Sequence, residues 1–279
     1  LRVDEAQALS SWRALRDISA TGTIRLGMPT LSRPFYHHLF TGVPAHASGV
    51  RSNRFAQRAR YDSVMDRVRA AGGHVFIAAD GLDWMRRMYR RSGDGGSDRR
   101  DALDEAPLER TIAAWRSAAA PSLLVVHHVR VDATAHHGGI DSPTHVRALA
   151  QADRVVAHIA ESEGSLFVLS DHGHRDAGGH GGDEPEVASA PILVRGPAPG
   201  PIAEPLDPDA LASSIALALG VARPRSAVSA PIERLATGPV PADAWYARAR
   251  GVARAGQQAS DLRLAGRRHG TLLFAFICI

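Results

Sequence analysis

The sequence contains one cysteine, Cys278, and no lysine, so all 33 of its basic side chains are arginines. A single cysteine excludes both a disulfide within the chain and a cysteine-based metal site. The arginines alternate with acidic residues and form no single-sign block, which argues against a nucleic-acid surface although the pI is about 9.9. The C-terminal apolar run at residues 271–279 is also shorter than the roughly 20 residues that span a bilayer.

Apolar segments of strand length alternate with amphipathic segments of helix length along most of the 279 residues. Such alternation predicts an α/β fold in which helices cover both faces of a mostly parallel sheet, a three-layer sandwich. We expect this domain to span residues 1–236. A helical tail at 237–279 would follow and lead into the start of a transmembrane segment. Strands are expected at 22–26, 74–79, 122–129, 165–169 and 190–195, and helices at 4–16, 62–71, 108–119 and 141–163.

Two finer expectations follow from the same pattern. The segment 92–100 is polar and is expected to be an exposed linker. The helix that begins after Asp141 is expected to bury one apolar stripe, because its apolar residues recur at helical spacing. That stripe comprises Val146, Leu149, Ala152, Val156 and Ile159.

Carboxylate and imidazole side chains follow two of the expected strands. Asp132 and His136 come after the strand at 122–129, whereas Asp171 and His172 follow the strand at 165–169, with His180 in the glycine-rich loop beyond. The carboxyl ends of parallel strands share one edge of the sheet, where open α/β folds keep their ligands. Mixed oxygen and nitrogen ligands suit a divalent cation, so we expect a metal site at this edge. A histidine-rich surface loop is the alternative.

Ser32 lies near the expected start of a helix, because Pro34 suits a first helical turn. A serine there faces free backbone N–H groups and the positive end of the helix dipole, and capping alone would explain it. Two divalent ions about 3.5 to 4 Å apart favour in-line displacement at phosphorus. A hydroxyl on one of them becomes a nucleophile near neutral pH. Ser32 is the best candidate for that hydroxyl.

At these residues the chain resembles the alkaline phosphatase superfamily, in particular its type I phosphodiesterase and nucleotide pyrophosphatase branch and the related GPI ethanolamine phosphate transferases. Residues 171–182 are similar to the transferases' Asp-His-Gly segment and the Gly-x-His-Gly-Gly that follows it. Residues 132–136 match an Asp-x-x-x-His element of the branch. Residues 80–84 are similar to a transferase segment in which acidic residues precede tryptophan. The resemblance covers roughly residues 1–225.

The segment from Pro29 to Asn53 resembles the nucleophile helix and the phosphate-binding asparagine that follows it. The register set by Thr41-Gly42 places the nucleophile at Ser32 rather than at Thr30. The resemblance implies that Ser32 attacks phosphorus to form a phosphoserine, and that Asn53 donates to a non-bridging oxygen. It further implies two divalent ions, zinc or alternatively manganese. Asp132, His136 and His180 would hold one ion, and Asp171, His172 and Ser32 the other.

The departures from the family pattern also matter. Members have a further metal-binding aspartate in an Asp-Gly-Leu-Arg-type segment, and this sequence starts at Leu1-Arg-Val-Asp, just after that point. We therefore expect the chain as given to lack one ligand and to be weakly active or inactive, with Asp4 in a helix. His174 stands where methionine is common and is expected to be a spare ligand or a substrate contact. Three other histidines are expected to be structural: His127, His128 and His137.

These observations favour a metal-dependent hydrolase or transferase that acts on phosphate esters, most of all phosphodiesters. A phosphomonoesterase, a phosphomutase-like relative and a noncatalytic metal-stabilised domain are the alternatives. A sulfatase is disfavoured because its formylglycine motif does not continue with Phe35 and Tyr36. The substrate would be a small or lipid-linked phosphate ester. From the family and the apolar tail we expect a periplasmic or other extracytoplasmic location with attachment to a membrane.

Overall fold

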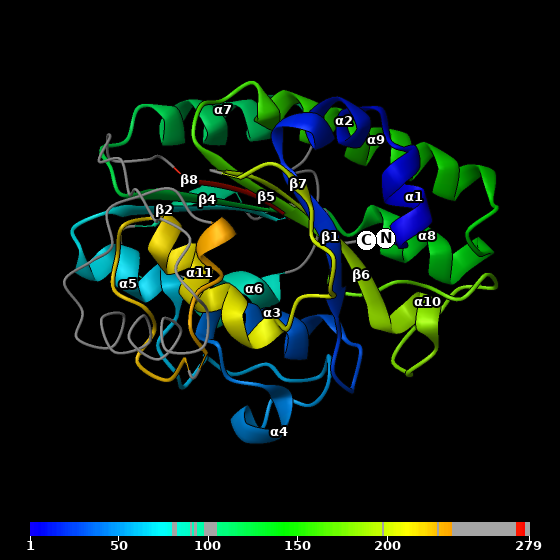
Figure 1. Ribbon diagram of the computed structural model, residues 1–279, viewed down its shortest axis with the longest axis horizontal. Coiled ribbons are helices and arrows are strands. Elements are labelled where there is room, and N and C mark those ends of the chain that lie inside the picture. The colour runs from blue at the N-terminus through cyan, green and yellow to red at the C-terminus, as the bar shows by residue number, and fades with distance from the viewer. Residues whose placement is uncertain are drawn as a thin grey trace.

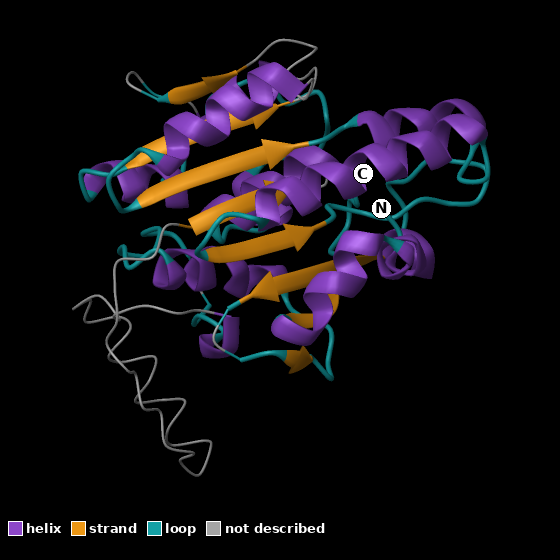
Figure 2. Cartoon of the chain, turned by 90° about the horizontal axis from the view of Figure 1, so that it is seen from above, coloured by secondary structure: helices purple, strands orange, loops and turns teal. Residues whose placement is uncertain are grey.

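The fold is organised around a sheet of eight strands in the order β3-β2-β4-β8-β5-β6-β1-β7 (Figure 2). The computed structural model describes residues 1–79, 83–89, 91, 94–97, 105–196, 198–227, 229–235 and 272–276. Among these strands only β6 runs antiparallel to its neighbours, so the prediction of a mostly parallel sheet is confirmed. The strands are β1 (Ala20–Arg25), β2 (His74–Ala79), β3 (Gly95–Ser97), β4 (Ser122–His127), β5 (Ser165–Leu169), β6 (Ser189–Arg195), β7 (Gly200–Pro201) and β8 (Leu272–Phe276).

Helices cover both faces of this sheet, which confirms the predicted three-layer sandwich (Figure 1). One face carries α1 (Val3–Ala8), α2 (Ser10–Leu15), α7 (Glu105–Arg116) and α9 (Pro143–Ala160). The other carries α3 (Ser32–Thr41), α5 (Val64–Ala70), α6 (Asp83–Tyr89) and α11 (Leu211–Ala218). A separate apolar core fills each interface between sheet and helices. The shorter helices are α4 (Ala45–Ser48), α8 (Arg130–Gly138) and α10 (Pro185–Ala188), with 3₁₀ turns at Arg16–Ile18, Pro208–Ala210 and Glu233–Leu235.

The C-terminal apolar run is a strand over its described part. Leu272–Phe276 forms β8, which pairs in parallel with β4 on one side and β5 on the other. The expectation that this run begins a transmembrane helix is therefore not met at these residues. A short, wholly apolar run is ambiguous between a buried strand and a helix, and only the two neighbouring strands decide between them. The remainder of the predicted tail, 237–271 and 277–279, lies outside the described residues.

Three local expectations differ from the structure. The predicted helix at 4–16 is divided at Leu9, whose extended backbone separates α1 from α2. The Asp153 carboxylate on α9 accepts hydrogen bonds from the N–H groups of Ser10 and Ser11, so a side chain distant in sequence caps α2. Within the expected linker, β3 adds an edge strand to the sheet. Val146 belongs to the stripe of the α9 helix that the sequence predicts to be buried, but its side chain is 56% exposed.

The centre of the sheet gives the first testable prediction. Phe167 in β5 is fully buried and belongs to the core beneath α3 and α11. Phe167→Ala is expected to lower the free energy of unfolding by about 3 to 5 kcal/mol, because it removes buried apolar surface and leaves a cavity. Denaturant unfolding measures this change. Val146→Ala, at an exposed site, should change the same quantity by less than about 0.5 kcal/mol. Equal effects would contradict the assigned core.

Candidate active site

The predicted site residues lie where three neighbouring parallel strands end. His127 in β4, Phe276 in β8 and Leu169 in β5 are paired at the same level of the sheet. The strand expected to reach 129 stops at His127, and helix α8 begins three residues later. Asp132 and His136 are therefore one helical turn apart on α8 instead of lying in a loop. Their spacing places both on one side of that helix, facing the residues that follow β5.

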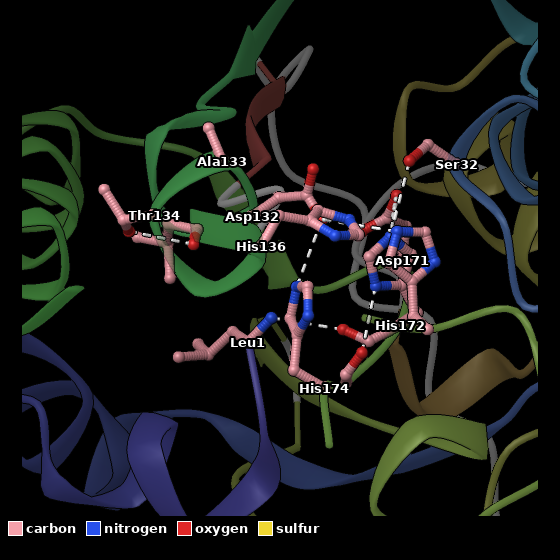
Figure 3. Close-up of polar contacts among 12 residues, drawn as sticks. Leu1, Ser32, Asp132, Ala133, Thr134, His136, Asp171, His172 and His174 are labelled. Atoms are coloured by element: carbon pink, nitrogen blue, oxygen red, sulfur yellow. Dashed lines mark hydrogen bonds and ion pairs between the residues drawn. The ribbon is translucent and has the colours of Figure 1, made fainter. Parts of the chain in front are cut away.

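Asp132 is the centre of a cluster of imidazole rings. Its Oδ1 lies 3.1 Å from His174 Nε2 and 3.4 Å from the Nε2 atoms of His136 and His180 (Figure 3). The ring of His172 stacks on that of His180, with centroids 3.6 Å apart. Side chains that follow β4 and β5 thus meet in one site, as the sequence predicted.

Two groups in this cluster have the geometry to hold a metal ion. In each, one ligand atom from every residue lies within 4.8 Å of the others. Asp132 belongs to both groups, which differs from the division implied by the family resemblance. The His180 ring stacks on that of His172, and these two histidines belong to one group. His174 belongs to the other group, together with His136. The groups are Asp132, His136 and His174, and Asp132, His172 and His180.

Ser32 is the first residue of α3 and faces this cluster. Leu31 is the N-cap residue, and Ser32 Oγ makes no capping hydrogen bond. Instead, Ser32 Oγ lies 3.4 Å from His172 Nε2, which is itself 3.4 Å from the Asp171 Oδ2 atom (Figure 3). The interpretation of Ser32 as a simple helix cap is therefore wrong. The hydroxyl, the carboxylate and the imidazole lie together as the sequence predicted.

Asn53 lies beside the same helix start. The backbone N–H of Arg33 donates to Asn53 Oδ1 at 3.0 Å. A backbone N–H can only donate, so the contact identifies the amide oxygen and leaves the amide NH₂ group to donate elsewhere. The Asn53 side chain is exposed, and its donor group is available to a ligand next to Ser32.

Thr30 has a role that sequence reasoning missed. Its Oγ1 donates to the carbonyl of Gly182 at 2.7 Å and accepts from the N–H of Gly181 at 3.0 Å. The carbonyl of Thr30 lies 2.9 Å from His180 Nδ1. That contact orients the ring so that Nε2 faces Asp132, as second partners of metal-binding histidines commonly do. These residues are about 150 positions apart, and no local pattern signals their contact.

Burial holds two of the imidazoles in the neutral form that can bind a metal. It lowers the pKa of His172 well below its ordinary value, and that of His174 to about 4. His180 is the exception: burial acts to lower its pKa, but its hydrogen bond with Asp132 outweighs this and the pKa is raised. Burial also acts to raise the pKa of Asp132, yet hydrogen bonds from His174 and His180 outweigh it and lower that pKa.

Asp171 is a buried carboxylate whose negative charge is poorly compensated by its neighbours. It is 1% exposed, and neither oxygen has a hydrogen bond of good geometry, although the Ser32 hydroxyl lies close enough to act on its charge. Burial raises the pKa of Asp171 to about 6. A buried carboxylate without full compensation is costly. Divalent cations therefore fit this site, because they would neutralise Asp171 and use the lone pairs of the neutral imidazoles.

The three histidines expected to be structural belong to neither metal-binding group. His127 is buried with its ring edge-on to Tyr36 and Trp84. His128 is fully buried behind it. His137 lies on the outer side of α8, where its Nδ1 lies 2.6 Å from the Ala133 carbonyl. In the segment expected to contain acidic residues before tryptophan, Asp80 lies outside the described residues.

Comparisons with known proteins agree with this geometry. Residues 83–184 match the family model of type I phosphodiesterase/nucleotide pyrophosphatase. The human protein "GPI ethanolamine phosphate transferase 3, catalytic subunit" is 33% identical over 111 residues, 37% of this chain and 10% of that protein. Murine ectonucleotide pyrophosphatase/phosphodiesterase 5 superposes with a TM-score of 0.61 at 12% identity, covering 84% of this chain and 97% of that one. The chain therefore has an alkaline phosphatase-like fold, and its residues 83–184 are similar to type I phosphodiesterases and nucleotide pyrophosphatases.

Other solved structures share this fold. The phosphonate monoester hydrolase of Silicibacter pomeroyi superposes with a TM-score of 0.56 at 16% identity, covering 87% of this chain and 76% of that one. A 2-O GAG sulfatase superposes with a TM-score of 0.61 at 13% identity, covering 81% and 68%. The match to the human transferase spans about a tenth of that protein. Within the described residues, no helix has the length and apolar character needed to cross a bilayer.

Proposed function

We propose that this protein is a metal-dependent phosphoryl-transfer enzyme that acts on phosphodiesters through a phosphoserine intermediate on Ser32. The observation that supports the proposal most directly is the meeting of Ser32 with Asp171 and His172 beside the Asp132 cluster. A hydroxyl at a helix start, next to two groups able to hold divalent cations, is the arrangement expected for in-line displacement at phosphorus.

Two zinc ions, or alternatively manganese, would occupy the two groups that share Asp132. Asp171 and Ser32 would complete the group that contains His172 and His180. Bound there, such ions supply Lewis acidity to the phosphoryl oxygens and lower the pKa of the attacking hydroxyl.

The residues of the chain supply the remaining chemistry. Ser32 Oγ would form the new bond to phosphorus, and the leaving alcohol would depart on the opposite side. The first turn of α3 would direct the positive end of the helix dipole toward the phosphoryl group. The amide NH₂ of Asn53 would donate to a non-bridging oxygen. Water or an acceptor alcohol would then release the phosphoryl group from Ser32.

Turnover of bis(p-nitrophenyl) phosphate tests this function. We expect nitrophenol release that a chelator abolishes and added Zn²⁺ or Mn²⁺ restores. Zinc binding without turnover would instead favour the noncatalytic domain. Faster turnover of p-nitrophenyl phosphate than of the diester would favour the phosphomonoesterase. Undiminished turnover by the metal-free protein would reject the proposal.

The role of Asn53 gives a second prediction. Asn53→Ala is expected to lower kcat for the diester by roughly 100-fold, because removing one donor to a developing phosphoryl charge costs that much in comparable sites. The bound zinc content, measured after gel filtration, should not change, since Asn53 is in neither metal-binding group. Gln57→Ala, which removes an exposed amide nearby, is the matched control. Equal rates in the two variants would remove Asn53 from the mechanism.

The substrate and the location are part of the proposal. The human relative's name points to a lipid-linked phosphate ester, and we infer that a lipid-linked or small phosphodiester is used at an extracytoplasmic membrane surface. Fractionation of the native cells tests this location. Recovery of the full-length protein in the cytosolic fraction would exclude it.

A further inference from the structure

A cavity of about 360 Å³ opens beside the candidate active site. Its lining includes Thr30 and Asp171, and it continues along α3 past Pro34 and Phe35. Among the described residues, neither Asp132 nor any other member of its histidine cluster lines it. The cavity therefore adjoins the centre through Thr30 and Asp171, and no residue of α8 lines it.

The walls of the cavity are mainly apolar. Leu26 and Leu206 are 8% exposed and Phe35 is 7% exposed, so these side chains form a fixed surface. Met28, at 59% exposure, lies where the lining reaches solvent. Residues of the loop after β1 and of the loop before α11 line the cavity together with residues of helix α3. Such a cavity binds an apolar group by removing its surface from water.

Charged and polar side chains also line the cavity, among them Arg25, His46, Asp207 and the ion pair of His38 with Asp209. His38 Nε2 contacts Asp209 Oδ1, and the two side chains are 14% and 29% exposed. Asp207 holds the turn that carries Asp209, because its Oδ1 accepts the Asp209 N–H at 2.9 Å. His38 follows Ser32 by six residues in α3, which places it about 9 Å further along the helix. The pair thus offers a carboxylate to a ligand that extends away from Ser32.

From this placement we propose that the cavity binds the ester substituent that remains on phosphorus during the first step. The inference rests on the proposed function. In an in-line displacement the leaving alcohol would depart opposite Ser32, on the side of Asp132 and α8, whereas the cavity lies on the side of Thr30 and Asp171. The retained substituent would be an apolar chain that ends in a hydroxyl group, and the hydroxyl would donate to the Asp209 carboxylate.

A series of p-nitrophenyl diesters tests the assignment, because nitrophenolate is the leaving group in each one. The retained substituent is varied from methyl to hexyl, and 6-hydroxyhexyl is added. With the zinc-loaded protein, kcat/KM should rise by up to roughly fourfold for each added methylene until the cavity is full. The terminal hydroxyl should add about tenfold over hexyl.

Substitutions in the lining locate the effect. Leu206→Trp fills the cavity, and the hexyl-to-methyl ratio of kcat/KM should fall to near one. Ile18→Trp, at a 54% exposed position on the opposite side of the sheet, should retain the wild-type ratio. Asp209→Asn preserves the shape of the side chain and should reduce the hydroxyhexyl-to-hexyl ratio several-fold, because a charged acceptor is lost. Thermal unfolding of each variant verifies that it is folded.

The outcomes separate this inference from the function on which it rests. If the methyl diester is turned over but kcat/KM is flat from methyl to hexyl, the cavity assignment is wrong and the proposed function stands. A chain-length trend that persists in folded Leu206→Trp would also overturn the assignment. If the zinc-loaded protein turns over none of the diesters, the proposed function itself fails.

Discussion

Ser32→Ala is expected to lower kcat for bis(p-nitrophenyl) phosphate by about 1,000-fold or more. The substitution removes the atom that would form the bond to phosphorus, and loss of a nucleophile in a covalent mechanism has effects of that size. Ser32 Oγ makes no capping hydrogen bond, so α3 and the protein's stability should change little. The measurement is initial nitrophenol release with zinc present, together with the thermal unfolding temperature.

Two further variants separate nucleophilic catalysis from packing. Ser32→Thr keeps the hydroxyl and should retain activity to within about tenfold. Ser117→Ala removes an exposed hydroxyl just after the end of α7 and should retain the wild-type rate. Mass spectrometry of acid-quenched protein should detect one added phosphoryl ester on Ser32 in the wild type and none in Ser32→Ala. Retained turnover by Ser32→Ala would exclude Ser32 as the nucleophile.

The places of Asp132 and Asp171 could be predicted because each follows a continuous apolar run. Runs of that length and composition are typical of strands buried on both faces, and the ends of parallel strands meet at one edge. The residues that follow β4 and β5 therefore had to approach one another. Their approach does not require β4 and β5 to be neighbours, and in the structure β8 lies between them.

That intervening strand could not be predicted from local pattern. The run at 272–279 is apolar at every position, so it has neither the alternation of a half-buried strand nor the stripe of a surface helix. What makes Leu272–Phe276 a strand is the presence of free edges on β4 and β5. Those edges belong to segments more than 100 residues away, and a local window does not contain them.

The directions of the side chains within the site also could not be predicted from the sequence. A serine at a helix start most often caps the helix, and only the position of the His172 ring shows that Ser32 faces the cluster. The pairing of His174 with Asp132 depends on the path of the loop after β5. Thr30 fixes that path through hydrogen bonds to Gly181 and Gly182. The chemistry of the site could thus be predicted from residue types, while its division into ligand groups required coordinates.

Asp132→Asn is expected to weaken metal binding at both groups, because Asp132 is the one residue that they share. Asparagine keeps the size of the side chain and can still accept a hydrogen bond from His174, so folding should persist. It lacks the negative charge that compensates a divalent cation. We expect the zinc content after gel filtration to fall from two ions to fewer than one per chain. Turnover should fall by about 1,000-fold or more.

His136→Ala provides the comparison that makes this result specific. His136 belongs to only one of the two groups, and its side chain is 44% exposed, so its loss should leave the group with His172 and His180 intact. One zinc ion per chain should then remain, and isothermal titration with Zn²⁺ should resolve one strong site. If Asp132→Asn also retains one strong site, the carboxylate is not shared. The two ions would then be held by separate sets of residues. The family resemblance implies such a division, with Asp132 in one set and Asp171 in the other.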